Sequence, residues 1–472
     1  MTAGQAVTRA AAPADAIAAY HDLLAGTAGD QLAADSQGAL EAGLARRGLV
    51  FGTRALCTVL RPRLITERQY TALAARVARL QRALARAHEA ALADAAVRAQ
   101  FRLEAWEEAL LAAGPRAAVA SPTSRLDAFV VDTDGSGGTF ALTEVNGETP
   151  AGAAYNDALT EVFLALPALR AFARRWHVFP VFARHGITDA MLAAWRRWAD
   201  AAGRGRTGAP RVAILDWDDV PTRREFTLWQ EHLATLGVES VIADPRSAEY
   251  RDGALFVEGA AADLVYKRVL LSELVGRAGV EADVLRAWRD GAVCMVNPPD
   301  GKILHKKASL AVLSDERNAG LFDADQQAAI AECIPWTRVV EERRTLHGGA
   351  DVDLVAHVTA HKDQFVLKPN DEYGGAGIVL GWTVDAGEWE QAVRKALAEP
   401  YVVQERVAIP YEPYPSLEGG QVRVLDRMID TAPYVTDGAT VDGLLTRLST
   451  AALLNVTAGG GSQVPNFLVA PR

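Results

Sequence analysis

The chain has 472 residues, half of them apolar, and a formal net charge of -10. This length allows a large core and favours two or more lobes, and the acidic balance argues against nucleic acid or an anionic membrane as the main partner. Its three cysteines, Cys57, Cys294 and Cys333, lie far apart without metal-like spacing, which is typical of a cytoplasmic protein. The first residues lack a basic region followed by an unbroken apolar run, so we expect no secretory signal. No stretch of about 18 apolar residues without charge occurs, so we expect no membrane span.

Residues 1–115 are predicted to form an N-terminal helical region with a packing role. Ala14–Ala25 is the first candidate helix. Thr66 begins a second one, because Thr66-Glu67-Arg68-Gln69 has the form of a capping box. A further helix is expected over residues 89–112. The apolar positions after Thr66 recur at helical spacing: Leu73, Val77, Leu80 and Leu84.

Two apolar runs on either side of the glycine-rich segment 134–138 predict a β-hairpin. Because alternate side chains of a strand share one face, Arg125 and Asp127 point the same way, and so do Glu144 and Asn146. Two carboxylates and a carboxamide oxygen then converge beside a guanidinium. Hard oxygen ligands of this kind suit Mg²⁺ shared with nucleotide phosphates. The alternative is a solvent-facing hairpin with ordinary polar alternation.

The middle of the chain is predicted to change from helix to alternating strand and helix. Residues 165–205 are expected to be helical, with a linker at 203–208. Residues 206–300 then alternate strand and helix, which indicates a parallel, Rossmann-like sheet. No Gly-x-Gly-x-x-Gly occurs there, which disfavours a nicotinamide cofactor. The expected elements are Val212–Asp216, the helix Arg224–Leu236, Val238–Ala243 and Ala262–Lys267.

Phe365–Leu380 contains two apolar runs around a loop with Lys368 and three glycines. Such a loop lets backbone N–H groups approach an anion closely, and the lysine adds a positive charge. A plain glycine hairpin is the alternative.

A helix is predicted over 385–398 and a buried strand over Tyr401–Val407. Near the end we expect the strands Gln421–Met428, Ala432–Val435 and Leu444–Ser449, and a glycine run at 457–462 that either binds an anion or forms a mere loop.

The hairpin and the later loop together resemble the circularly permuted ATP-grasp family, which includes the synthetase domain of glutathionylspermidine synthase. In ordinary ATP-grasp enzymes the metal-binding Glu-x-Asn follows the nucleotide clamp, whereas here it precedes the clamp. The resemblance extends from about residue 120 to the C-terminus. It rests on Arg125-x-Asp127, Glu144-x-Asn146 before a Thr-Pro turn, Leu367-Lys368-Pro369 and Val402–Val407.

This resemblance implies an α/β (α+β) ATP-grasp fold in its circularly permuted form. The permuted part with the metal site would span 116–205, a Rossmann-like pre-ATP-grasp domain 206–300, and the nucleotide-binding lobes 301–472. It further implies that Mg²⁺ binds Asp127, Glu144 and Asn146, and that the transferring phosphate contacts Arg125 and Arg447. The ATP contacts would be Lys307 (with Lys306 the alternative), Lys368, Tyr373, Gly374, Gly375, Gly377, Gln404, Glu405 and Val407.

The chemistry that the resemblance implies is that of an ATP- and Mg²⁺-dependent carboxylate–amine ligase. A carboxylate would be converted to an acyl phosphate, and an amine would then displace phosphate. The partners would be small-molecule acids and amines, but their identity does not carry over, because no match to the family's glutathione-binding residues or amidase domain is seen. Two alternatives stay open, namely an ATP-dependent kinase of a small acid or alcohol and a non-catalytic scaffold.

Overall fold

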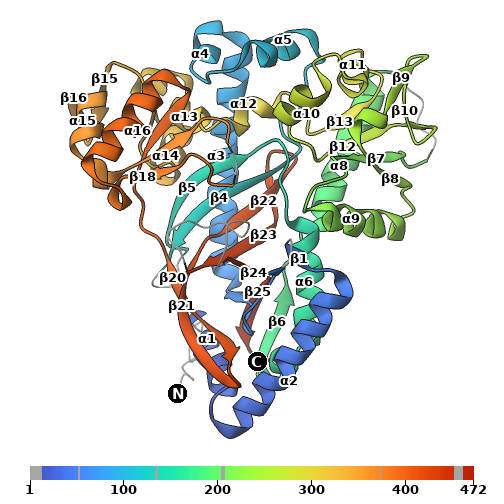
Figure 1. Ribbon diagram of the computed structural model, residues 1–472, viewed down its shortest axis with the longest axis vertical. Coiled ribbons are helices and arrows are strands. Elements are labelled where there is room, and N and C mark those ends of the chain that lie inside the picture. The colour runs from blue at the N-terminus through green and yellow to red at the C-terminus, as the bar shows by residue number, and fades with distance from the viewer. Residues whose placement is uncertain (1–12, 52–53, 133–136, 204–207, 373, 451–460) are drawn as a thin grey trace, which may run out of the picture.

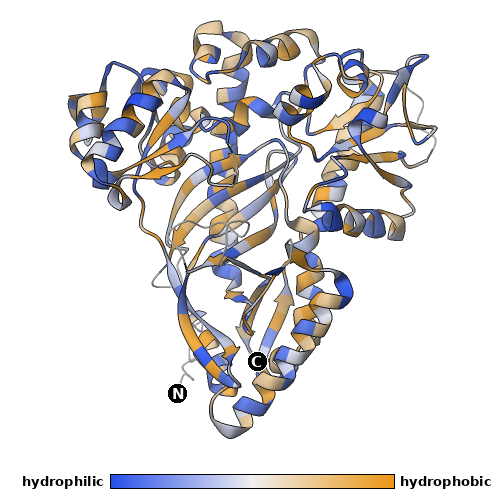
Figure 2. Cartoon of the chain, in the orientation of Figure 1, coloured by the Kyte–Doolittle hydropathy of each residue, from blue (hydrophilic) through white to orange (hydrophobic). Residues whose placement is uncertain are grey.

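The computed structural model describes residues 13–51, 54–132, 137–203, 208–372, 374–450 and 461–472. The predicted contact at Tyr373 and most of the predicted glycine run and linker lie outside these residues. A central seven-stranded sheet and two four-stranded sheets position the candidate site (Figure 1). Most strands of the two four-stranded sheets are rich in apolar residues and buried along nearly their whole length, as expected for sheets covered on both faces (Figure 2).

The central sheet is built from two distant parts of the chain. Its strand order is β20-β21-β23-β22-β4-β5, and β24 pairs with β23. The predicted hairpin forms as β4 (Thr123–Val131) and β5 (Thr139–Asn146), and β4 pairs antiparallel with β22. Figure 1 shows this cyan hairpin beside the red strands. The late strands are β20 (Tyr411–Glu418), β21 (Gln421–Ile429), β22 (Ala432–Thr436), β23 (Thr440–Ser449) and β24 (Ser462–Val464).

The parallel sheet predicted within 206–300 is confirmed. Its order is β13-β12-β7-β8, and every neighbouring pair is parallel. The strands are β7 (Val212–Leu215), β8 (Ser240–Ala243), β12 (Leu264–Lys267) and β13 (Cys294–Val296). Around them lie α9 (Arg223–Thr235), α10 (Leu271–Ala278), α11 (Asp283–Arg289) and a small sheet of β9 (Glu249–Arg251), β10 (Ala254–Val257) and β11 (Ala260–Ala262).

The second four-stranded sheet is antiparallel, in the order β14-β19-β17-β18. Trp389 of α16 is fully buried against it, and α16 begins at the predicted position because Asp385 caps the amide of Glu388. The elements of this lobe are α12 (Gly301–His305), α13 (Ala308–Ser314), α14 (Ala324–Cys333), β14 (Thr337–Val339), β15 (Arg344–His347), β16 (Ala350–Asp353), α15 (Leu354–Ala360), β17 (Phe365–Pro369), β18 (Val379–Leu380), α16 (Ala386–Ala398) and β19 (Tyr401–Glu405).

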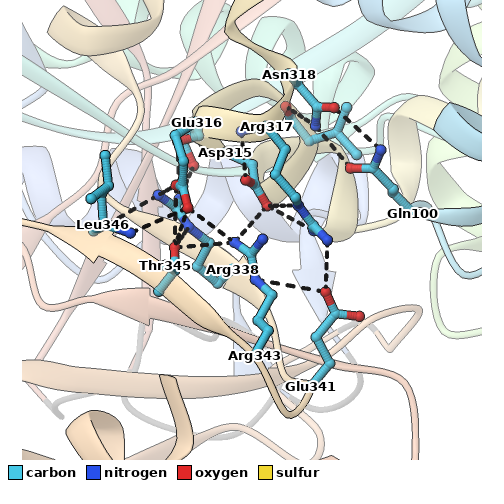
Figure 3. Close-up of polar contacts among 12 residues, drawn as sticks. Gln100, Asp315, Glu316, Arg317, Asn318, Arg338, Glu341, Arg343, Thr345 and Leu346 are labelled. Carbon is cyan, nitrogen blue, oxygen red and sulfur yellow. Dashed lines mark hydrogen bonds and ion pairs between the residues drawn. The ribbon is translucent and has the colours of Figure 1, made fainter. Parts of the chain in front are cut away.

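A buried polar network braces the inside of this lobe (Figure 3). Arg338 of β14 lies at its centre, with Nη2 2.6 Å from Oε2 of Glu316 and Nε donating to Oγ1 of Thr345 over 2.8 Å. Arg343 joins β15 to Asp315 over 2.8 Å. Arg338 and Asp315 are buried and their partners Glu316 and Arg343 are half-buried, and these opposite-sign pairs tie β14 and β15 to the segment that follows α13.

The N-terminal helices are α1 (Pro13–Leu23), α2 (Gly26–Arg47), α3 (Glu67–Ala93), α4 (Ala95–Ala99) and α5 (Ala105–Ala113). The capping box at Thr66 is confirmed, with the side chain of Gln69 reaching back to the Thr66 amide. The single helix predicted over 89–112 is wrong. Asp94 accepts from the Ala96 amide and starts a new helix there, because its side chain competes with continued helical bonding.

The prediction of continuous helix over 165–205 is also wrong. The helices α6 (Ala153–Ala165), α7 (Pro167–Phe172) and α8 (Arg184–Ala201) are interrupted by β6 (Trp176–Pro180). β6 pairs antiparallel with β25 (Asn466–Pro471), which also pairs with β3 (Arg63–Ile65). Two further short strands pair with each other, β1 (Val50–Phe51) and β2 (Arg54–Ala55). Among the described residues, no helix has both the length and the apolar character needed to cross a bilayer.

Candidate active site

The β4–β5 hairpin presents four polar side chains on one face. Asp127 lies directly opposite Glu144, and Arg125 lies opposite Asn146. Residues that are directly opposite in an antiparallel pair share a face of the sheet. Immediately beyond Asp127 the register shifts, which leaves Thr143 as an extra residue in β5. Such a bulge bends the strand and changes the direction of neighbouring groups.

Asp127 accepts hydrogen bonds from two arginines. Arg125 donates through Nε over 2.6 Å and through Nη2 over 3.0 Å, and Arg447 of β23 donates through Nη2 over 2.7 Å. Burial alone would raise the pKa of Asp127, but the two guanidinium groups hold it well below its usual range. Arg447 also donates to Asp430 over 2.7 Å, and burial raises the pKa of Asp430 against the effect of that arginine. Two arginines and two carboxylates therefore form one buried cluster.

Lys307 is the lysine that lies beside Glu144. Its Nζ is 3.2 Å from Oε1 of Glu144 and donates to the carbonyl of Glu372 over 2.6 Å. Burial would raise the pKa of Glu144, but Lys307 keeps it below the usual range. The alternative residue, Lys306, points elsewhere, with Nζ 2.8 Å from Glu107 and 3.0 Å from Asp371. Of the two lysines, Lys307 is the one placed at the hairpin face.

Lys368 joins the two antiparallel sheets. Its Nζ donates to the carbonyl of the bulged residue Thr143 over 3.0 Å and to Oε1 of Gln404 over 2.7 Å. Gln404 in turn donates through Nε2 to Oγ1 of Thr337 over 3.0 Å, which fixes the orientation of its amide. Burial lowers the pKa of Lys368 to about 8, and the nearby Glu144 partly offsets that effect. A lysine with this pKa changes charge just above neutral pH.

The other predicted contacts lie at the rim of the same seam. Glu405 follows Gln404 on β19, so its side chain points to the opposite face, where it is 44% exposed and 3.8 Å from Nε2 of His347. Val407 is half-buried just beyond the end of β19. The loop glycines all adopt a left-handed φ that a residue with a Cβ would find strained: Gly374 (65°), Gly375 (81°) and Gly377 (69°).

The donor set on the hairpin is compatible with Mg²⁺. An ionised carboxylate has about four lone-pair sites, and the three hydrogen bonds to Asp127 leave one of them on Oδ1. Glu144 has only Lys307 as an ion-pair partner among the described residues. The group of Asn146 that could ligate a metal is its carboxamide oxygen, not the buried and unpartnered Nδ2. Within the described ranges, however, no group of three or more His, Cys, Asp or Glu residues is arranged to hold a metal. An Asp–Glu–Asn set with oxygen donors is consistent with that result.

Two members of the cluster were missed in the sequence. Asp430 follows a predicted strand, but nothing in its spacing shows that Arg447, 17 positions later, returns to it. The carbonyl of Thr143 could not be found either, because it accepts from Lys368 only where the β5 bulge exposes it. Both depend on pairing between distant parts of the chain.

Comparison with known proteins finds distant relatives that align with only part of this chain. No family model matches the chain. A putative glutamate–cysteine ligase of Frankia alni is 26% identical over 238 residues, which are 48% of this chain and 25% of that protein. A second one, from Frankia casuarinae, is 26% identical over 224 residues, which are 45% of this chain and 24% of that protein. The chain thus aligns with about a quarter of the length of these relatives.

Similarity in structure is more extensive. The apo form of a glutathione synthetase-like effector from Globodera pallida covers 93% of this chain and 97% of its own, with a TM-score of 0.58 and 11% identity. At this identity the likeness shows a shared fold. D-alanyl-alanine synthetase A from Vibrio cholerae covers 56% of this chain, but its TM-score of 0.27 is too low to support an argument. The fold is therefore a mixed α/β one shared with the effector over nearly the whole chain.

Proposed function

We propose that the chain is an ATP- and Mg²⁺-dependent carboxylate–amine ligase of the circularly permuted ATP-grasp type, which acts through an acyl phosphate. One observation carries the proposal. Lys307 and Lys368 from the lobe around β17 meet Asp127, Glu144 and Arg447 of the central sheet at a single seam. Figure 1 shows that lobe, in orange, beside the cyan hairpin.

Charge neutralisation is the physical demand that this seam would meet. A carboxylate must approach a polyanionic nucleotide, and fixed cations lower the cost of that approach. Lys307 and Lys368 would hold the nucleotide phosphates, and Arg125 and Arg447 would stabilise charge on the transferring group. Asp127, Glu144 and Asn146 would hold Mg²⁺, which when bound neutralises phosphate charge.

The remaining contacts would enclose the nucleotide. Gln404, Glu405 and Val407 lie where the chain leaves β19 for the central sheet, and they would contact the base and ribose. Backbone N–H groups at Gly374, Gly375 and Gly377, next to Tyr373, would cover the phosphates. Closure there would exclude water, which otherwise hydrolyses an acyl phosphate. No protein nucleophile is needed for this chemistry.

The domain order would be that of a permuted ATP-grasp enzyme. Along the chain, the hairpin within 116–205 comes before the parallel sheet at 206–300 and before the nucleotide lobes at 301–472. In the fold, however, β4 of the hairpin pairs with β22, which belongs to the nucleotide lobes. That pairing supports the permuted arrangement. The relatives named glutamate–cysteine ligases support small amino-acid-like acids and amines as substrates. The three cysteines are buried free thiols, which supports a reducing cytoplasm as the location.

Trapping of the acyl phosphate tests the reaction class. Candidate acids would be incubated with ATP, Mg²⁺ and hydroxylamine, and both ADP and hydroxamate would be measured. The proposal predicts a hydroxamate that forms without any amine and competes with the amide when an amine is present. A stable phosphorylated product that does not react with hydroxylamine would identify a kinase instead. Glu161→Gln is a suitable control, because that glutamate pairs with Arg47 and Arg184 at the surface.

A further inference from the structure

A buried chain of alternating charges runs beneath the candidate nucleotide site. Three lysines and three carboxylates take part, and each inner group lies between two partners of opposite sign. The order is Glu107, Lys306, Asp371, Lys302, Glu148 and Lys267, with the successive N–O distances 2.8, 3.0, 2.8, 3.2 and 3.0 Å. Glu107 also lies 3.8 Å from Nζ of Lys302. Charges buried this deeply are tolerable only when each one is paired. In their ionised forms the six groups carry three positive and three negative charges.

The members of this ion chain come from four separate parts of the fold. Glu107 belongs to α5 of the N-terminal helical region, and Glu148 follows the hairpin. Lys267 ends β12 of the parallel sheet, Lys302 lies in α12, and Asp371 lies just beyond β17. Five of the six are buried, and Asp371, the exception, is the member nearest the glycine loop. The ion chain therefore connects the N-terminal region to the segment that leads into that loop.

A second set of contacts ties the same two regions together through Asn370. Its Nδ2 donates to the carbonyl of Phe101 over 2.9 Å, and its Oδ1 accepts from the Ala308 amide over 2.9 Å. Its carbonyl accepts from the Lys307 amide over 2.9 Å. The backbone that carries Lys307 is thus fixed to residue 370, and residue 370 is fixed to the turn between α4 and α5.

A third contact lies deeper in the lobe. Gln100 and Asn318 exchange amide hydrogen bonds of 2.8 and 3.2 Å, as Figure 3 shows. This pair holds the end of α4 against the segment after α13. The packing role predicted for residues 1–115 is therefore incomplete, because this region also supplies hydrogen bonds and a charge to the neighbourhood of Lys307.

We infer that Glu107 is a positioning residue of the nucleotide site, which holds Lys306, and through Lys306 the carboxylate of Asp371, so that Lys307 faces Glu144. The expected effect on nucleotide binding rests on the proposed function, whereas the effect on the position of Lys307 does not. Glu107 occupies Lys306 with a buried ion pair, so that of these two adjacent lysines Lys307 is left for the nucleotide. Without the charge of Glu107, Lys306 keeps Asp371 as its one ion-pair partner among the described residues, and we expect it to shift towards the segment 370–372.

The test compares Glu107→Gln with Glu108→Gln in the full chain. Glu108 is the neighbouring residue of α5, and its ion pair with Arg98 lies partly exposed away from the ion chain. Amide hydrogen exchange of the free protein would be followed at Lys307 and Ala308, which donate to Asn370. Affinity for a non-hydrolysable ATP analogue with Mg²⁺ would be measured by calorimetry.

We expect faster exchange at both amides and analogue affinity weaker by about tenfold in Glu107→Gln, because small misplacements of binding groups are costly. Glu108→Gln should match the wild type. A lower melting temperature with unchanged exchange and unchanged affinity would overturn the inference. If the wild type did not bind the analogue, the proposed function would fail, and exchange alone would still decide whether Glu107 holds these amides. Should Glu107→Gln not fold, the charge-balanced Glu107→Gln/Lys306→Gln variant serves for the exchange measurement.

Discussion

Arg447 and Asp127 lie 320 positions apart in the chain, yet Nη2 of the arginine donates to Oδ2 of the aspartate over 2.7 Å. The same guanidinium is 2.5 Å from Asp430, so one arginine neutralises two buried carboxylates. Asp127 belongs to the early hairpin and Arg447 to a late strand. This contact therefore links the assembly of the central sheet to the charge balance of the candidate active site.

Loss of Arg447 should destabilise the protein. In Arg447→Gln, Asp430 loses its cation and Asp127 keeps Arg125, and breaking a buried ion pair in this way costs about 3 to 5 kcal/mol. Urea denaturation would measure the free energy of unfolding. The control is Arg197→Gln, whose partner Asp437 is 2.5 Å away at the surface and 44% exposed, so a loss below about 1 kcal/mol is expected. Equal losses in the two variants would contradict this account of the cluster.

Nucleotide affinity should fall as pH rises through about 8. The pKa of Lys368 is lowered to about 8 by burial, so the free protein loses this positive charge above that pH. Phosphates near Lys368 favour the charged form, which means that binding at high pH takes up a proton and becomes weaker. Calorimetry between pH 7 and 9.5 would measure the slope. In Lys368→Arg the guanidinium stays charged throughout, and the slope should disappear. A slope that persisted in this variant would assign the titration to another group.

Thr337 should influence stability and nucleotide affinity indirectly, because its hydroxyl fixes the side-chain amide of Gln404. Thr337→Val removes the acceptor of the buried Gln404 Nε2, and an unsatisfied buried donor costs about 1 to 3 kcal/mol. The amide can then reorient, so Lys368 loses a fixed acceptor and analogue affinity should fall several-fold. Thr359→Val, which only removes a bond to a carbonyl within α15, should change stability by less than about 0.5 kcal/mol. The prediction fails if both variants leave analogue affinity at the wild-type value.

Loss of the Asn146 carboxamide should raise the Mg²⁺ concentration that the enzyme needs for turnover. Asn146→Ala removes one oxygen donor, so the Mg²⁺ concentration for half-maximal turnover should rise by roughly tenfold or more. Asn146→Asp keeps an oxygen at the same place and should stay near the wild type. The measurement is ADP release as Mg²⁺ is titrated at saturating ATP. Identical Mg²⁺ curves for Asn146→Ala and the wild type would remove this residue from the metal site.

The sequence predicted those parts of the fold that depend on local pattern. The hairpin at Thr123–Asn146, the capping box at Thr66, the helix that follows Asp385 and the parallel sheet all form as expected. In each of them, neighbouring residues carry the signal, either as alternation along a strand or as a side chain that caps a nearby amide. The register of the hairpin then determines which side chains share its face.

The sequence-based predictions were wrong or incomplete where contacts between segments far apart in the chain determine the structure. Trp176–Pro180 became a strand because Asn466–Pro471 pairs with it, and no local pattern shows that partner. Glu107 lies in a helix whose pattern suggests packing, and only the fold brings it to Lys306. The choice between Lys306 and Lys307 likewise depends on which carboxylate each one meets. Sequence spacing gives candidates for such sites but not their partners.

Calorimetric titration with a non-hydrolysable ATP analogue, with and without Mg²⁺, would show whether the seam between the β4–β5 hairpin and the lobe around β17 binds a nucleotide. The proteins are the wild type, Glu144→Ala and the surface control Glu161→Gln. We predict Mg²⁺-dependent binding to the wild type and to Glu161→Gln, and loss of that dependence in Glu144→Ala while the variant stays folded. Absence of binding to the wild type under every condition would contradict the claim that this seam is a nucleotide site.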